Sequence, residues 1–225
     1  MSAGRPAIPE GIGQKPEFQE LGLQLKSHTS AEISTEDNIF DIKIKSPKCA
    51  LKTTFKLLQY KNGNEKEVPE GVFTQMKDDD VVFHLALPEP AWYKLNIFAT
   101  KLDAAGSTLP NVFTYMIDLK RAKEAVKPYP KAYADFAKGC YLHKPLFLDT
   151  TKDLSKVHFK VEVKDAKRVA VKAGDEWFQL TKQGGDLWEG DVNLQPYRGK
   201  GVPVNLNASI GSDETQFATL LQYTV

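Results

Sequence analysis

The sequence predicts an all-β protein with two antiparallel β-sandwiches in tandem, and three observations support this. Short stretches of alternating apolar and polar residues recur along the chain, which is the period of a strand with one buried face. Turn signals such as Asn62-Gly63 and Gly174-Asp175 separate these stretches. The plan of the first half then returns about a hundred residues later, a spacing too long for a solenoid repeat.

The stretch from Glu89 to Ala99 organises the first half. It begins with a corner that contains Pro90, and apolar residues then alternate from Tyr93 to Ala99. A proline-rich corner followed by such a strand is typical of the central strand F of an immunoglobulin-like sandwich, in which a tyrosine hydroxyl bonds back to the corner backbone. We therefore predict that Tyr93 makes this hydrogen bond.

The other strands of the first half can be placed around this one. Six further segments show strand patterning: 18–25, 40–44, 51–60, 68–74, 81–87 and 113–119. Together they make about seven short strands, the number expected of an immunoglobulin-like sandwich. The predicted first domain spans residues 16–120, and the Gly- and Pro-containing residues 1–15 are predicted to be a flexible leader.

The second half follows the same plan. Strand patterning is expected at 136–142, 157–163, 169–171, 177–180, 188–194, 202–208 and 217–225. The boundary between the halves is rich in Lys and Ala, and Pro128 would stop any helix there. We predict a linker at residues 121–128 and a second immunoglobulin-like sandwich at residues 129–225.

Composition excludes several classes of function. The formal net charge is +1, so overall charge gives no reason to expect binding to nucleic acid or an anionic membrane. No apolar run approaches the roughly 20 residues that span a bilayer, and the N-terminal residues contain no apolar signal segment. Cys49 and Cys140 fall in different repeats, so neither domain can hold an inter-sheet disulfide. This indicates a reducing compartment and predicts a cytoplasmic protein.

A segment at residues 129–146 resembles the one that opens the last domain of the kyphoscoliosis peptidase and hillarin family. The matching positions are Pro130, Tyr133, Phe136, Gly139, Cys140, Leu142, Pro145 and Leu146. The segments at 16–23 and 89–99 are similar to the preceding domain of that family, so the resemblance covers about residues 15–225.

The resemblance implies immunoglobulin-like domains of a cytoskeleton-associated protein. Family members usually carry a transglutaminase-like core with a Cys-His-Asp triad before these domains, and this chain has no counterpart of that core. The enzymatic activity is therefore not carried over to this chain.

Neither cysteine is predicted to be catalytic. A nucleophilic thiol needs a lowered pKa, usually from a helix N-terminus and a nearby histidine. Pro145 argues against a helix around Cys140, and His143 would lie on the opposite face of a strand. We expect Cys140 to be a buried structural residue, and Cys49 has no better context. No catalytic, cofactor-binding or metal-binding residue is predicted, so the chain is not expected to be an enzyme or to bind a small-molecule substrate.

Three polar features have a plainer explanation than a binding site. The histidines share no metal-ligand spacing, and His84 and His158 are expected to face solvent. The run Asp78-Asp79-Asp80 lacks the spacing of a calcium loop and reads as a solvated turn. The boundary cations could form a site for anionic lipid or a phosphoprotein, although a solubilising linker is favoured; they are Lys120, Arg121, Lys123, Lys127 and Lys131.

The predicted function is a non-catalytic protein-interaction or scaffold module with a protein partner, which the resemblance suggests is cytoskeletal. One alternative is an accessory part of a transglutaminase-like peptidase. Another is a carbohydrate-binding sandwich, which would need an exposed aromatic platform; instead, Trp177 and Trp188 are expected to fill the second core.

The predicted binding site is the last strand, residues 217–225. An extended peptide could add to its edge, because the strand carries no Lys or Pro. Its outward residues are expected to be Ala218, Leu220, Gln222 and Thr224. Packing of this face against the first domain is the alternative.

Overall fold

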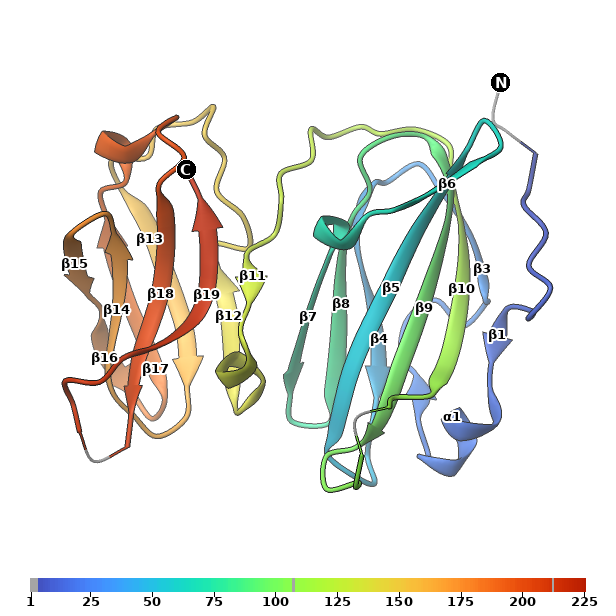
Figure 1. Ribbon diagram of the computed structural model, residues 1–225, viewed down its shortest axis with the longest axis horizontal. Coiled ribbons are helices and arrows are strands. Elements are labelled where there is room, and N and C mark those ends of the chain that lie inside the picture. The colour runs from blue at the N-terminus through green and yellow to red at the C-terminus, as the bar shows by residue number, and fades with distance from the viewer. Residues whose placement is uncertain (1–3, 107, 212) are drawn as a thin grey trace. The chain divides into compact units, whose positions relative to one another are not determined.

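The computed structural model describes residues 4–106, 108–211 and 213–225, and its strands form two compact units (Figure 1). The first unit comprises Met1–Thr74 and Asp78–Val126, and the second comprises Gln75–Lys77 and Lys127–Val225. Each unit has two sheets whose pairings are antiparallel, with one parallel exception. The chain is therefore an all-β protein of immunoglobulin-like sandwiches, as the sequence predicted.

The larger sheet of the first unit has the order β1-β10-β9-β5-β6, and β3 runs parallel to β10. Its strands are β1 (Gly13–Gln14), β3 (Glu32–Thr35), β5 (Leu51–Lys61), β6 (Asn64–Glu67), β9 (Ala91–Lys101) and β10 (Asn111–Leu119). The facing sheet has the order β2-β4-β8-β7. Its strands are β2 (Gln24–Leu25), β4 (Ile39–Lys45), β7 (Val72–Lys77) and β8 (Asp80–Ala86).

The second unit repeats this order. One sheet runs β11-β19-β18-β14-β15 and the other runs β12-β13-β17-β16. The strands are β11 (Lys131–Ala132), β12 (Cys140–Lys144), β13 (Val157–Val163), β14 (Ala166–Ala173), β15 (Glu176–Gln179), β16 (Thr181–Gly184), β17 (Leu187–Val192), β18 (Pro203–Ile210) and β19 (Ala218–Thr224). The chain passes from one sheet to the other at Leu180, between β15 and β16.

A tyrosine corner closes the first sandwich, as predicted. The Tyr93 hydroxyl donates to the Glu89 carbonyl oxygen at 2.7 Å, and Gln59 Nε2 donates to the same hydroxyl at 3.0 Å. Tyr93 is 0% exposed, and burial raises its pKa to about 12. The corner therefore fixes the start of β9 against β5 through a buried hydroxyl.

In each unit a short helix stands where the first predicted strand was expected to begin. The helix α1 (Pro16–Glu20) precedes β2, and the 3-10 helix η2 (Ala134–Ala137) precedes β12. Pro16 sits at the start of α1, where its missing N–H costs nothing. Gly22 and Gly139 follow these helices with φ values of +67° and +92°, which side-chain-bearing residues rarely adopt. The two segments do correspond, but alternation of apolar residues was the wrong guide to their conformation.

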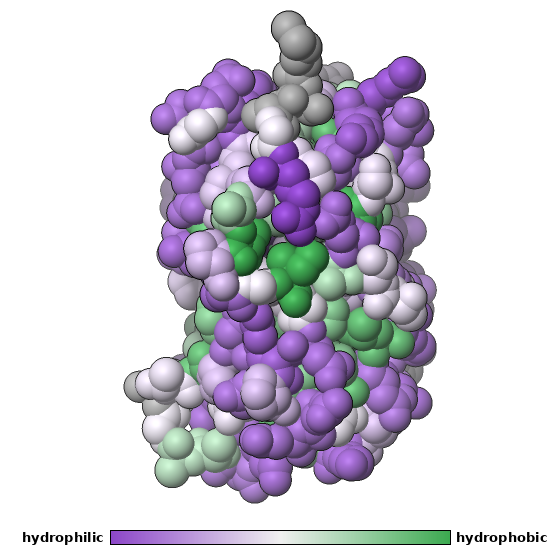
Figure 2. Space-filling view, turned by 90° about the vertical axis from the view of Figure 1, so that its right-hand side faces the viewer, coloured by the Kyte–Doolittle hydropathy of each residue, from purple (hydrophilic) through white to green (hydrophobic). Residues whose placement is uncertain are grey.

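Part of the predicted leader is incorporated in the first unit. Residues Gly13–Gln14 form β1 and pair with β10. Glu10 accepts a hydrogen bond from Lys94 Nζ at 2.6 Å, and this contact lowers the pKa of the Glu10 carboxyl. Figure 2 shows the side that carries β1 and β3, where hydrophobic residues gather near the middle among hydrophilic ones.

Candidate functional site

The buried thiol is protonated at neutral pH. Cys140 lies on β12 with 4% of its surface exposed, and its Sγ donates to the Asp135 carbonyl oxygen at 3.8 Å. Burial raises the pKa of the Cys140 thiol to about 12, and the Asp135 carboxylate adds to this effect. His143 Nε2 lies 2.8 Å from Glu162 Oε1. A nucleophilic cysteine needs the opposite shift, a lowered pKa.

The two histidines that were predicted to face solvent, His84 and His158, differ in their exposure. His158 lies beside Asp191, with 2.8 Å between Nδ1 and Oδ1, and is partly exposed. The expectation that His84 faces solvent is wrong, because it is 6% exposed. Asp41 lies directly opposite on β4, with Oδ1 2.7 Å from His84 Nδ1, and the Phe73 ring stacks on the imidazole at 6.0 Å. Across the residues that the structure describes, no group of three or more His, Cys, Asp or Glu side chains could hold a metal ion.

The boundary cations do not form a concentrated positive surface. Four of the five lie within 4 Å of a carboxylate: Lys120 with Asp118, Arg121 with Glu36, Lys123 with Asp37, and Lys127 with Asp149. Lys131 Nζ lies 5.1 Å from the centre of the Tyr133 ring. Local ion pairs therefore compensate most of this charge, as expected of a solvated segment. Within the described part of the chain, no helix combines the length and the apolar character needed to span a bilayer.

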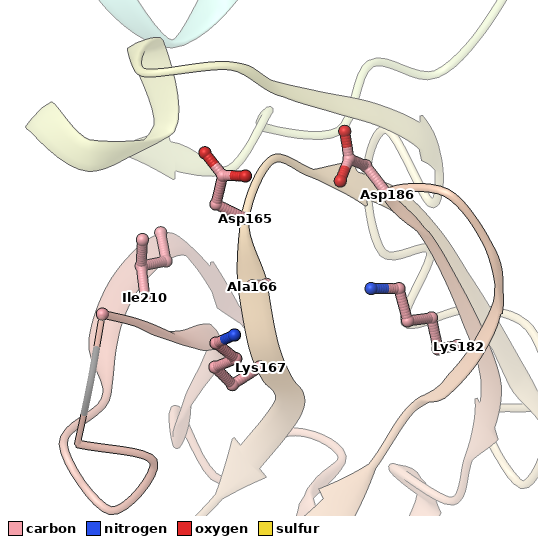
Figure 3. A pocket seen from close by; sticks show the side chains of 7 residues that line it. Asp165, Ala166, Lys167, Lys182, Asp186 and Ile210 are labelled. Carbon is pink, nitrogen blue, oxygen red and sulfur yellow. The ribbon is translucent and has the colours of Figure 1, made fainter.

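An open hollow at one end of the second unit brings opposite charges together. Figure 3 shows carboxylates of Asp165 and Asp186 and ammonium groups of Lys167 and Lys182 around it. These four residues are exposed to solvent. The hollow therefore offers no buried polar group that would select a ligand.

A row of aromatic and cationic side chains lies on the outer face of the sheet β11-β19-β18-β14-β15. Trp177 on β15 and Phe217 before β19 have ring centres 5.0 Å apart. Lys172 Nζ lies 5.4 Å from the centre of the Trp177 ring, and the Arg168 guanidinium lies 5.4 Å from the Phe217 ring. We call these four residues the aromatic row. Contacts of this kind bring positive charge to the face of an aromatic ring.

The prediction that both tryptophans fill the second core is wrong for one of them. Trp188 is 6% exposed, whereas Trp177 is 44% exposed. The reason is the register of the strands. Lys172 lies between the fully buried Val171 and Ala173 on β14, so its side chain points outward. Trp177 pairs with Lys172 and therefore lies on the same outer face. The sequence contained a signal for this, because Trp177 is two residues beyond Asp175 in a two-residue hairpin turn, which sets the register.

A small residue on the same outer face, Ala170, is fully buried. Ala170 lies between Arg168 and Lys172 on the outward side of β14, yet it is 0% exposed. Its partners on the neighbouring strands are Gln179 and Asn207, whose side chains are larger. The contact between the two rings and the two contacts between a cation and a ring join Trp177, Phe217, Lys172 and Arg168 into one continuous row.

The rest of this outer face is polar and lacks negative charge. Gln222 Nε2 donates to Asn205 Oδ1 at 3.0 Å, and Thr219 Oγ1 donates to Asn207 Oδ1 at 2.8 Å. Three cations point outward on the described strands of this sheet, namely Lys131, Arg168 and Lys172, and no carboxylate does. The face therefore combines exposed aromatic surface with uncompensated positive charge.

The prediction that Leu220 points outward is wrong. Leu206 on β18 pairs with Leu221, and the next residue, Asn207, pairs with Thr219. Leu220 therefore has no partner on β18, falls in a β-bulge and is 0% exposed. The strand edge is also partly covered, because β11 pairs with Leu221 and Gln222.

The other predicted outward residues of this strand divide between the two faces. Ala218 pairs with the buried Ala208 and belongs to the core side. Gln222 and Thr224 remain on the outer face, where they pair with Asn205 and Pro203.

The sheets of the two units define the class of the protein as a tandem of immunoglobulin-like β-sandwiches. Residues 12–130, more than half of the chain, match the model of the KY-like, immunoglobulin-like domain family. The chain belongs to this family, which confirms the resemblance found in the sequence. No curated protein matches the chain.

Among solved structures, the chain is similar to a fimbrial chaperone and to immunoglobulin domains of titin. The class 5 fimbriae chaperone CfaA matches with 9% identity and a TM-score of 0.29, covering 89% of this chain and 98% of the chaperone chain. A titin tandem of immunoglobulin domains matches with 12% identity and a TM-score of 0.23, covering 84% and 90%. Titin domains in complex with telethonin match with 14% identity and a TM-score of 0.24, covering 86% and 90%.

Proposed function

We propose that this chain is a non-catalytic protein-interaction module that binds its partner through the outer face of the sheet β11-β19-β18-β14-β15. The observation that carries the proposal is the aromatic row, in which Trp177 is 44% exposed. Tryptophan and arginine are the residues that most often dominate binding energy at protein interfaces. Trp177 lies on the strand β15 and Phe217 directly precedes β19, so little order has to be imposed on the two rings when a partner binds.

The proposed partner is cytoskeletal, and the proposed location is the cytoplasm. The first of these rests on the resemblance to the kyphoscoliosis peptidase and hillarin family. The second is supported by the two cysteines, Cys49 and Cys140, which are both free in the structure.

A second candidate function is an accessory role beside a transglutaminase-like cysteine peptidase. Membership of the KY-like family favours it. In that role the catalytic thiol would come from another domain, and the raised pKa of Cys140 supports this. In that role the module would position a substrate protein and take no part in the chemistry.

The exposed Trp177 also favours a carbohydrate-binding sandwich, but the polar groups beside it favour a protein partner. Sugar recognition needs amide and hydroxyl groups that are available to the ligand. Here Asn205, Asn207, Thr219 and Gln222 already bond to one another.

Affinity capture from cytosolic extract with the intact chain tests the proposal. The unchanged chain should capture a specific set of proteins in which cytoskeletal components are enriched. The variant Trp177→Ser should no longer capture this set. Leu102→Ser is the matched control, because Leu102 is 53% exposed on the first unit. A captured set that Trp177→Ser leaves unchanged, or that both variants lose equally, would contradict the proposal.

A further inference from the structure

The edge strand β15 is unusually open to pairing. It ends the sheet order β11-β19-β18-β14-β15, so one side of it has no neighbour among the described strands. Its sequence, Glu-Trp-Phe-Gln, contains none of the Lys or Pro residues that usually blunt an edge. By contrast, the corresponding edge strand β6 of the first unit is fully exposed and carries three charged residues in four.

The free backbone groups of β15 belong to two residues. Ala173 and Glu176 close a two-residue hairpin, and the Leu180 N–H donates to the Val169 carbonyl at 2.9 Å. Because hydrogen-bonded and non-bonded pairs alternate in an antiparallel ladder, residues 176, 178 and 180 bond to β14. Trp177 and Gln179 therefore direct their N–H and C=O groups away from the sheet.

The side chains at this edge present two different faces. On the outer face, Lys172 reaches across from β14 and places its ammonium group over the Trp177 ring, so positive charge lies close to the edge. On the core side, Phe178 is half-buried and offers apolar surface at the margin of the sandwich. Glu176 pairs with the core-facing Ala173, so its carboxylate does not oppose the charge on the outer face.

We infer that β15 accepts an extended acidic segment of the partner protein as an added strand. The inference rests on the proposed function and specifies how the partner is held. The backbone of the segment would bond to Trp177 and Gln179, with its carboxylates toward Lys172 and Arg168 and its alternate apolar side chains beside Phe178. Backbone pairing supplies affinity in such complexes, and the alternating side chains supply specificity.

Peptide binding to the intact chain tests the inference. The probe is a peptide of sequence Ser-Glu-Val-Glu-Val-Glu-Val-Ser, and the control replaces each Glu with Lys. In the free protein the amide protons of Trp177 and Gln179 should exchange rapidly with solvent. The acidic peptide should slow both by at least about tenfold at saturation, because each becomes hydrogen-bonded, and the basic peptide should not.

Two matched pairs of variants separate the edge from the face. Gln179→Pro removes an edge-facing N–H and no bond to β14, so affinity should fall about tenfold while Gln179→Ala stays within about twofold. Lys172→Glu should weaken binding and reduce its dependence on salt. Lys52→Glu is the control, since Lys52 is an exposed strand residue of the first unit.

Several results would overturn the inference. Unchanged exchange at Trp177 and Gln179 in the presence of saturating acidic peptide would do so, as would equal binding of the two peptides. If Trp177→Ser abolishes capture from extract but Gln179→Pro does not, the face binds the partner without strand addition, and the proposed function survives alone. Self-association that protects the same amides, or protection by a soluble oligosaccharide and not by peptide, would replace the occupant with a second copy or a glycan.

Discussion

Removing the Tyr93 hydroxyl tests the tyrosine corner that organises the first unit. In Tyr93→Phe the ring stays in place, because it is 0% exposed and packed within the sandwich. The hydrogen bond to the Glu89 carbonyl, at 2.7 Å, is lost, and so is the acceptor for Gln59 Nε2 at 3.0 Å. The hydroxyl also accepts a longer contact of 3.4 Å from the Glu89 backbone N–H, so the change deletes three contacts of one oxygen atom and little else.

The expected loss of stability is about 1–2 kcal/mol, which is one to two net hydrogen bonds. The lower part of this range is set by Gln59, whose Nε2 retains a bond to Glu89 Oε1 at 3.0 Å. The upper part of the range applies if the Glu89 carbonyl oxygen, which loses its hydrogen-bond donor beside the buried ring, finds no other donor. A loss of this size lowers the thermal midpoint by about 2–8 °C in a unit of this length.

Hydrogen exchange of the intact chain at increasing urea can measure this loss, since it reports the amides of β9 separately from those of the second unit. The slowest-exchanging amides of β9 should lose protection, and those of β18 should not. Tyr133→Phe is the control, because the Tyr133 hydroxyl makes a long contact of 3.5 Å in the second unit. A change below about 0.5 kcal/mol for Tyr93→Phe would refute the corner as a stabilising element.

Three further outcomes are expected. Trp188→Ala should lower the free energy of unfolding by about 3–5 kcal/mol, because it opens a cavity in the core. Trp177→Ala should lower it by less than about 1 kcal/mol, because Trp177 is exposed; urea denaturation measures both. Leu220→Lys should destabilise the second unit by at least about 3 kcal/mol in the same assay, and a small effect would place Leu220 outside the core. Iodoacetamide should modify Cys49 before Cys140 at pH 8, because Cys140 is buried. Since burial raises the pKa of the Cys140 thiol to about 12, full stability should hold below about pH 8.5 and should fall as pH rises toward 12.

Alternation of apolar residues was enough to predict the sheets and the repeat. It identified β4, β5, β8, β9 and β10 in the first unit because each of these strands has an apolar face that meets a core. The corner at Glu89 and Tyr93 was also predictable, since the proline-rich turn and the tyrosine are close together in sequence. These features depend on local patterns, which the sequence shows directly.

The errors arose where a neighbouring strand decides the environment. Leu220 was assigned outward by strict alternation, but a one-residue bulge against β18 turned it inward. His84 alternates correctly, yet Asp41 and Phe73 from adjacent strands enclose it. Trp177 was assigned to the core because tryptophan is usually buried, while its register with Lys172 places it outside. The bulge at Leu220 and the neighbours of His84 cannot be read from one strand alone, whereas the two-residue turn before Trp177 did signal its register.

The equivalence of the two units shows that the fold does not require an aromatic residue at position 177. The hairpins β5–β6 and β14–β15 both have two-residue turns, closed by Lys61 and Asn64 in one and by Ala173 and Glu176 in the other. One residue beyond the closing pair, Glu65 occupies the position of Trp177. Since a glutamate at this site is compatible with the same sheet order, the exposed tryptophan is free to serve binding, and Trp177→Glu should leave the second unit folded. Circular dichroism and the thermal midpoint will check this, and a midpoint lowered by more than about 5 °C would instead assign Trp177 a structural role.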